Sequence, residues 1–267
     1  MYVKYQQEVS KYGEKDTKIA LCTYLITGVI VIAFWVAVDT FDMTGPLGST
    51  VNFVVVPAIF IGMVFAIVLI KKQGLTSIGF HKGISWPRFR FGLLLALIFL
   101  TFGIAPGLIY GWEFNNLRTI ISTILTTFIL AAFEDIYFIG YLQPRLYGRF
   151  KNDVPAIFVG AILMVLFHIP VGLFNPTDVS WFSMIVSWSI NYLIMVLIFR
   201  KYFSIVHVFI FHTFVNFLTH GRLWIEFDPE YSIAWGTTAW LIILLLVVIL
   251  EIVRYYRARN AVSSQQN

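Results

Sequence analysis

The sequence predicts an all-α protein built as a bundle of membrane-spanning helices. Hydrophobic residues make up 59% of the 267 residues, charged residues make up 12%, and the mean hydropathy is +0.81. These values lie outside the range of soluble domains. No segment alternates apolar and polar residues over about ten positions, as the strands of a membrane barrel do. Helices are therefore the only spanning structure that satisfies the backbone hydrogen bonds inside the bilayer.

Apolar segments long enough to cross a bilayer recur along the whole chain. A helix needs roughly 20 residues to cross a hydrocarbon layer about 30 Å thick. About eight segments approach this length, and they lie at residues 19–38, 51–70, 91–110, 119–143, 154–174, 181–199, 203–219 and 232–250. No repeat or low-complexity linker separates them, so we expect one domain over residues 1–267.

Basic residues fall on alternate sides of these predicted spans. Of the 19 Lys and Arg residues, all except Arg118 and Arg222 lie in segments on one side of the membrane. The positive-inside rule then places both termini in the cytoplasm. The net charge of +5 is spread over separate loops beside the spans, so we expect membrane lipid headgroups as partners and no binding of nucleic acid.

Three of the spans carry polar groups that hydrocarbon should exclude. Glu134 and Asp135 follow fifteen uncharged residues in the span 119–143, and His168 lies inside the next span. His212 and Asn216 lie four residues apart, which places them on one face of a helix. Because a charged group at the bilayer centre costs about 2.5–3.5 kcal/mol, these residues are expected to have a function.

These residue types match the requirements for water attack on a carbonyl group. Glu134 with His168 can take a proton from water, while His212 with Asn216 can stabilise the oxyanion that develops on the substrate. Asp135 is expected to titrate together with the adjacent Glu134. The structural alternative is a hydrogen-bond network that joins the helices. A proton-coupled transporter also places such groups at mid-membrane and is a further alternative.

The order of these motifs resembles the CAAX protease and bacteriocin-processing family, also called the Abi family. The matching features are Glu-Asp-x-x-Phe-x-Gly, a span containing a histidine, and His-x-x-x-Asn, all within residues 119–220. The resemblance implies an intramembrane endopeptidase that hydrolyses a peptide bond in a membrane-associated substrate, of the prenylated CAAX type or similar to a bacteriocin. The implied partner is a hydrophobic or lipidated peptide or protein.

The resemblance also implies a role for each motif residue. Glu134 corresponds to the carboxylate that activates water, Asp135 to its acidic neighbour and His168 to its partner. His212 and Asn216 correspond to the groups that stabilise the oxyanion. All five are therefore expected to be catalytic.

Three positions depart from the family pattern. Asp135 replaces a glutamate, Met164 replaces an aromatic residue, and Ile139 replaces an arginine. An apolar Ile139 cannot pair with carboxylates, although Arg145, six residues further along, is a candidate to reach back towards the acidic pair. The replacement supports an alternative function, a catalytically silent relative that acts in bacteriocin immunity or binds peptides in the membrane.

A metal requirement stays open from the sequence alone. Glu134, His168 and His212 form a set of the kind that holds catalytic zinc, and they would be metal ligands only if the reaction depends on zinc. Asn216 is a poor zinc ligand and no His-Glu-x-x-His motif is present, which favours a metal-free mechanism. The compact chain is similar to bacterial members of the family, so a bacterial plasma membrane is the expected location.

Overall fold

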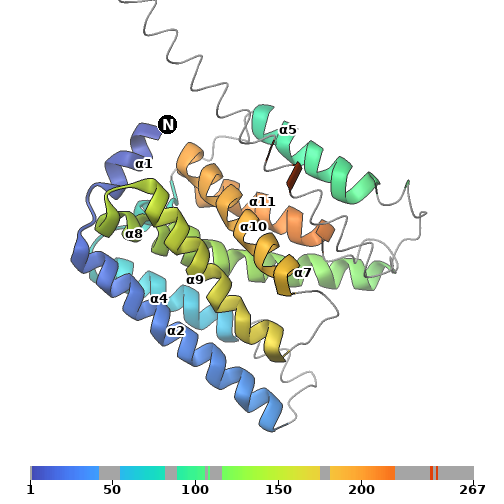
Figure 1. Cartoon of the computed structure of the whole chain (residues 1–267), viewed down its shortest axis with the longest axis horizontal. Helices are drawn as coiled ribbons and strands as arrows, with labels where there is room; N and C mark the ends of the chain where they lie inside the picture. Colours follow the sequence, from blue (N-terminus) through green and yellow to red (C-terminus); the bar gives the residue numbers. More distant parts are fainter. Residues whose placement is uncertain are drawn as a thin grey trace, which may run out of the picture.

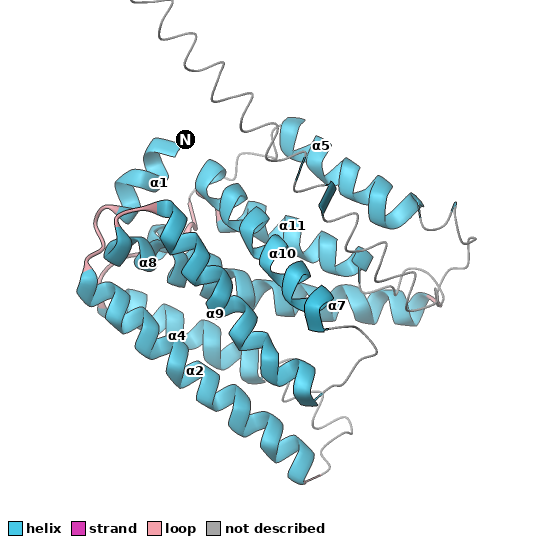
Figure 2. Cartoon of the chain, viewed as in Figure 1, coloured by secondary structure: helices cyan, strands magenta, loops and turns pink. Residues whose placement is uncertain are grey.

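The described part of the protein is entirely helical. The structure is a computed structural model that describes residues 2–41, 55–81, 89–105, 108, 116–174, 181–219, 241, 242 and 245. Every regular element within these ranges is a helix, as Figure 2 shows. The fold class predicted from the sequence is confirmed.

The helices are arranged as a layered bundle (Figure 1). In chain order they are α1 (Tyr2–Val9), α2 (Glu14–Thr40), α4 (Val56–Ile70), the 3-10 helix η2 (Leu75–Ile78), α5 (Phe89–Ile98), the π-helix η3 (Phe99–Ile104), α7 (Leu117–Glu134), the π-helix η4 (Asp135–Leu142), α8 (Gln143–Phe150), α9 (Asp153–Phe174), α10 (Trp181–Tyr202) and α11 (Ile205–Thr219). The first seven predicted spans each coincide with one or more of these helices. The eighth, at 232–250, lies outside the described elements.

The protein is an integral membrane protein by the length and composition of its helices. Four described stretches are long and apolar enough to cross a bilayer: Glu14–Val38, Ile120–Phe150, Asp153–Pro170 and Met184–Tyr202. Two further apolar helices, Val56–Ile70 and Ile205–Leu218, are shorter. The outer surfaces of α2 and α9 expose large apolar side chains, including Val29 at 67% and Phe158 at 66%, which suits contact with lipid. The count of eight spans and the cytoplasmic termini stay predictions.

The π-helix η4 lies at the centre of the bundle. It contacts α2, α4, α9, α10 and α11, besides the helices α7 and α8 that precede and follow it. All eight of its residues are buried. A π-helix is rare and is often found at a functional site, and here it begins at the second residue of the acidic pair.

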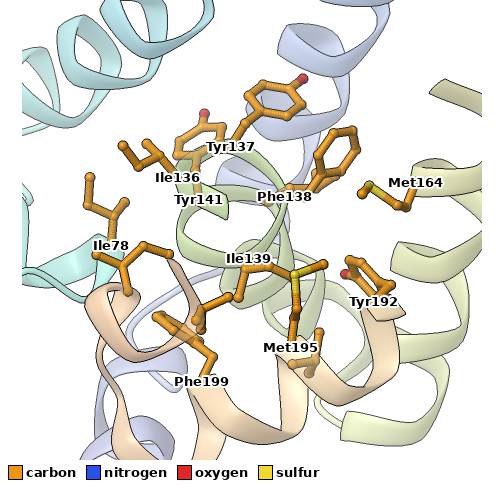
Figure 3. Close-up of a cluster of buried hydrophobic side chains, with 14 of the residues drawn as sticks. Ile78, Ile136, Tyr137, Phe138, Ile139, Tyr141, Met164, Tyr192, Met195 and Phe199 are labelled. Atoms are coloured by element: carbon orange, nitrogen blue, oxygen red, sulfur yellow. The ribbon is translucent and has the colours of Figure 1, made fainter. Parts of the chain in front are cut away.

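Gly140 allows η2 to pack closely against η4. A Cβ atom on Gly140 would lie 2.8 Å from the backbone oxygen of Ile78, closer than real Cβ contacts. The neighbouring Ile139 is fully buried within the apolar cluster in Figure 3, which also contains Ile78, Met195 and Phe199. The packing of this cluster fixes η4 within the bundle and therefore fixes the direction of the acidic side chains at its start.

Candidate active site

The acidic pair lies where the α-helical geometry of α7 changes to the π-helical geometry of η4. Glu134 is the last residue of α7 and Asp135 is the first residue of η4. The side chain of Glu134 is 12% exposed, whereas that of Asp135 is fully buried. The two adjacent carboxylates therefore differ in their exposure to solvent.

The Glu134 carboxylate lies between two imidazole rings that come from different helices. Its Oε1 atom is 3.6 Å from Nε2 of His168 on α9, and its Oε2 atom is 3.7 Å from Nε2 of His212 on α11. Both separations are slightly longer than a direct hydrogen bond. A water that lies to the side of such a pair can hydrogen-bond to both atoms. The region bordered by the Glu134, His168 and His212 side chains is called the polar space.

Asp135 binds the other side of the His212 ring. Its Oδ1 atom lies 2.9 Å from His212 Nδ1, and the His212 side chain is only 2% exposed. Because an ionised carboxylate only accepts hydrogen bonds, Nδ1 of the ring donates this one. The contact directs Nε2 of His212 towards Glu134. The other Asp135 oxygen, Oδ2, is buried and has no hydrogen-bond partner among the residues that the structure describes.

His168 is held by its own helix. Nδ1 of the ring donates a 2.8 Å hydrogen bond to the backbone oxygen of Met164, one turn earlier on α9. In the neutral ring Nε2 then carries the free lone pair, and this atom faces Glu134. Met164 itself is buried, and its side chain packs in the apolar cluster. Pro170 lies inside α9 two residues after His168.

Asn216 is the one predicted site residue without a contact to the others. It is partly buried on α11, one turn after His212. No hydrogen bond joins it to Glu134, Asp135, His168 or His212 within the described part of the chain. The structure therefore brings four of the five predicted residues together and places the fifth on the same helix face as His212.

The residues do not form a ready metal site in the described ranges. No group of three or more His, Cys, Asp and Glu side chains there is arranged to hold a metal ion. Glu134 presents a different oxygen atom to each imidazole. The use of zinc by Glu134, His168 and His212, and its alternative, a metal-free mechanism, both stay predictions.

Arg145 does not reach the acidic pair, and that expectation is wrong. The Arg145 guanidinium donates hydrogen bonds to the backbone oxygen of Tyr141 and to the side chain of Gln73. It also lies over the rings of Tyr12 and Tyr141, 4.7 Å and 4.1 Å from their centroids. These contacts hold a fully buried cation on α8, so Arg145 does not take the place of the arginine that the family pattern has at position 139.

Two aromatic contacts concern histidines near the site. His207, to which the sequence assigned no role, stacks on Tyr202 with ring centroids 4.4 Å apart. The indole ring of Trp188 on α10 lies against His168, with centroids 4.8 Å apart. Trp188 lies only about one turn inside the span Met184–Tyr202, so its place in the sequence does not distinguish it from a Trp that anchors a span end.

These features define an integral membrane protein whose central polar site combines a carboxylate with two imidazoles. Residues 115–218 match the family model described as type II CAAX prenyl endopeptidase Rce1-like. The matched segment includes every residue of the site, and the match agrees with the resemblance to the CAAX protease family found in the sequence. This family is one of proteases, which supports a hydrolase. No curated protein and no solved structure matches the chain.

Proposed function

We propose that this protein is an intramembrane endopeptidase that hydrolyses a peptide bond in a prenylated substrate of the CAAX type. The observation that carries the proposal is the position of Glu134 between the Nε2 atoms of His168 and His212, within a segment that matches a family of prenyl endopeptidases. A carboxylate and two imidazoles around one polar space are suited to proton transfer.

The proposed reaction begins with a water molecule between Glu134 and His168. The water donates one hydrogen bond to Glu134 Oε1 and one to the Nε2 lone pair of His168, which face each other at 3.6 Å. Glu134 takes one proton as the water oxygen attacks the scissile carbonyl carbon. It then gives this proton to the leaving amide nitrogen, the C–N bond breaks, and the products are a carboxylic acid and an amine.

The oxyanion is stabilised from α11. A His212 ring protonated on both nitrogens donates from Nδ1 to Asp135 and from Nε2 into the polar space beside Glu134. The Asp135 carboxylate offsets the positive charge of this ring. Asn216, one turn further on the same helix face, supplies a second donor to the substrate oxygen. A preorganised donor of this kind contributes about 10²–10³ in kcat.

The proposal includes a metal-free mechanism and a bacterial plasma membrane as the location. Asn216 is a poor zinc ligand and the sequence has no His-Glu-x-x-His motif, which supports the first point. Four helices able to cross a bilayer and the apolar outer surface support a substrate that is itself held in the membrane. A lipid-attached peptide meets this condition because its lipid chain partitions beside the helices.

A cleavage assay tests the proposal directly. The purified protein in lipid nanodiscs is mixed with an internally quenched farnesylated peptide that ends in a CAAX sequence. We expect cleavage by the wild-type protein and a loss of about 10²–10⁴-fold in kcat for Glu134→Gln. Glu14→Gln is the matched control, because Glu14 lies at the start of α2 with its side chain 53% exposed. Equal cleavage by wild type and Glu134→Gln would refute the proposal.

A second candidate is a catalytically silent member that binds peptides or confers immunity to a bacteriocin. The observation that favours it is Ile139, which is fully buried in an apolar cluster where the family pattern has arginine. The same farnesylated peptide distinguishes the two functions. Saturable binding with no cleavage product would support the silent function, whereas product that disappears in Glu134→Gln would exclude it.

A further inference from the structure

Trp188 contacts the site from a helix that carries none of the family motifs. It lies on α10, which packs against both α9 and α11, the helices of His168 and His212. Its indole ring lies against the His168 imidazole, with ring centroids 4.8 Å apart and planes inclined by 35°. We propose that Trp188 is a positioning residue that holds the His168 ring in the orientation needed for hydrolysis. This inference rests on the proposed function.

The His168 ring needs a second constraint. Its hydrogen bond to the Met164 backbone oxygen fixes Nδ1, but a bond at one atom leaves the ring free to tilt about that atom. The second side-chain torsion of histidine is broad and opposes this tilt only weakly. A tilt would turn Nε2 away from Glu134 Oε1, now 3.6 Å distant. The Trp188 ring lies against the imidazole at a tilt of 35° and opposes this movement by steric contact.

The indole ring of Trp188 can also stabilise positive charge on the His168 ring. When the imidazole accepts a hydrogen bond from the attacking water it gains partial positive character, and the face of a tryptophan ring attracts positive charge more strongly than tyrosine or phenylalanine does. Phe167 approaches the same imidazole edge-on, at 5.9 Å and 71°. Phe167 does not stack on the face of the imidazole ring. Trp188 is therefore the residue that contacts this face.

The contact with His168 separates Trp188 from ordinary membrane anchors. Tryptophans that anchor a helix lie at the ends of spans, as Trp181 does, 40% exposed and just before the span Met184–Tyr202. Trp188 lies inside that span, is half-buried, and touches a site residue. The two tryptophans on one helix therefore provide a matched pair of substitutions.

The first test separates kcat from KM with the quenched farnesylated peptide. We expect Trp188→Leu, which removes the flat ring but stays apolar, to lower kcat by about 10- to 100-fold while KM stays near the wild-type value. Trp188→Phe should restore most of the rate because it restores an aromatic face. Trp181→Leu should match the wild type. A Trp188→Leu protein that folds and has the wild-type kcat would overturn the inference.

The second test needs no activity. The chain has 5 histidines, so ¹⁵N-histidine NMR in nanodiscs can assign the His168 signal by its absence in His168→Gln. We expect Trp188→Leu to shift or broaden this signal, and Trp188→Phe and Trp181→Leu to leave it in place. An unchanged signal in Trp188→Leu would overturn the inference. If the wild type cleaves no peptide, the proposed function fails, and this spectrum alone decides whether Trp188 positions His168.

Discussion

Asp135 accepts a 2.9 Å hydrogen bond from Nδ1 of His212, and both side chains are almost completely buried. The adjacent carboxylate, Glu134, faces Nε2 of the same ring at 3.7 Å. Two consecutive residues therefore lie beside opposite nitrogen atoms of one imidazole ring. Asp135 determines which nitrogen of His212 is turned towards the polar space, although its own carboxylate lies on the other side of the ring.

This relationship predicts that Asp135→Asn lowers activity without unfolding the protein. Asparagine keeps the size of the side chain and an oxygen acceptor, but it removes the charge that supports a doubly protonated His212. We expect kcat for the farnesylated peptide to fall by about 10²-fold, with an unchanged melting temperature. In the His212→Gln background the same substitution should cause no further loss, because the two residues act as a unit. Fully additive losses would show that Asp135 acts elsewhere.

Removal of metal ions is predicted to leave cleavage unchanged. The described residues contain no convergent ligand set, and the proposed proton transfers use Glu134 and the two imidazoles alone. Purified protein should contain far less than one zinc ion per chain by mass spectrometry of the metals. Cleavage should persist after dialysis against a strong chelator. Activity that is lost with the chelator and restored by zinc would contradict the metal-free mechanism.

Part of this site could be predicted from the sequence because its signals are local. The apolar runs predicted α9 and α10 closely, and polar residues within apolar runs identified Glu134, His168 and His212. The contact between Asp135 and His212 could not be predicted. Neighbouring residues of an α-helix point about 100° apart, and nothing in the uniformly apolar stretch around Asp135 indicates the change to a π-helix.

The contacts of Arg145 could not be predicted from the sequence either. Its partners Gln73 and Tyr12 lie far away in the chain and outside the family motifs. Distance along the chain placed Arg145 nearest the acidic pair, but the packing of α8 against α2 and α1 turns it away. Interactions that depend on such packing appear only when the whole bundle is assembled.

Gly140→Ala is predicted to destabilise the fold. The added methyl group would lie 2.8 Å from the backbone oxygen of Ile78, and a backbone atom cannot move aside cheaply. We expect a loss of about 1–3 kcal/mol, the usual cost of overpacking, measured by unfolding in mixed detergent micelles. Gly62→Ala on α4 is the control, because nothing lies within 4 Å of its added methyl group. Equal stability of the two variants would contradict the close packing of η2 on η4.

Arg145→Met is predicted to loosen the N-terminal segment from the bundle. The guanidinium is 1% exposed and connects α8 to Gln73 and to the ring of Tyr12. Methionine keeps much of the apolar stem but removes both side-chain hydrogen bonds of the guanidinium. A hydrogen bond from a charged group contributes about 1.5–3 kcal/mol, so the melting temperature should fall by several degrees. Limited proteolysis should then cut between α1 and α2 sooner than in the wild type.

Arg149→Met is the control on the same helix, since the Arg149 side chain is 58% exposed and forms an ion pair with the exposed Glu14. If both variants resisted proteolysis equally, Arg145 would not be what holds α1 in place.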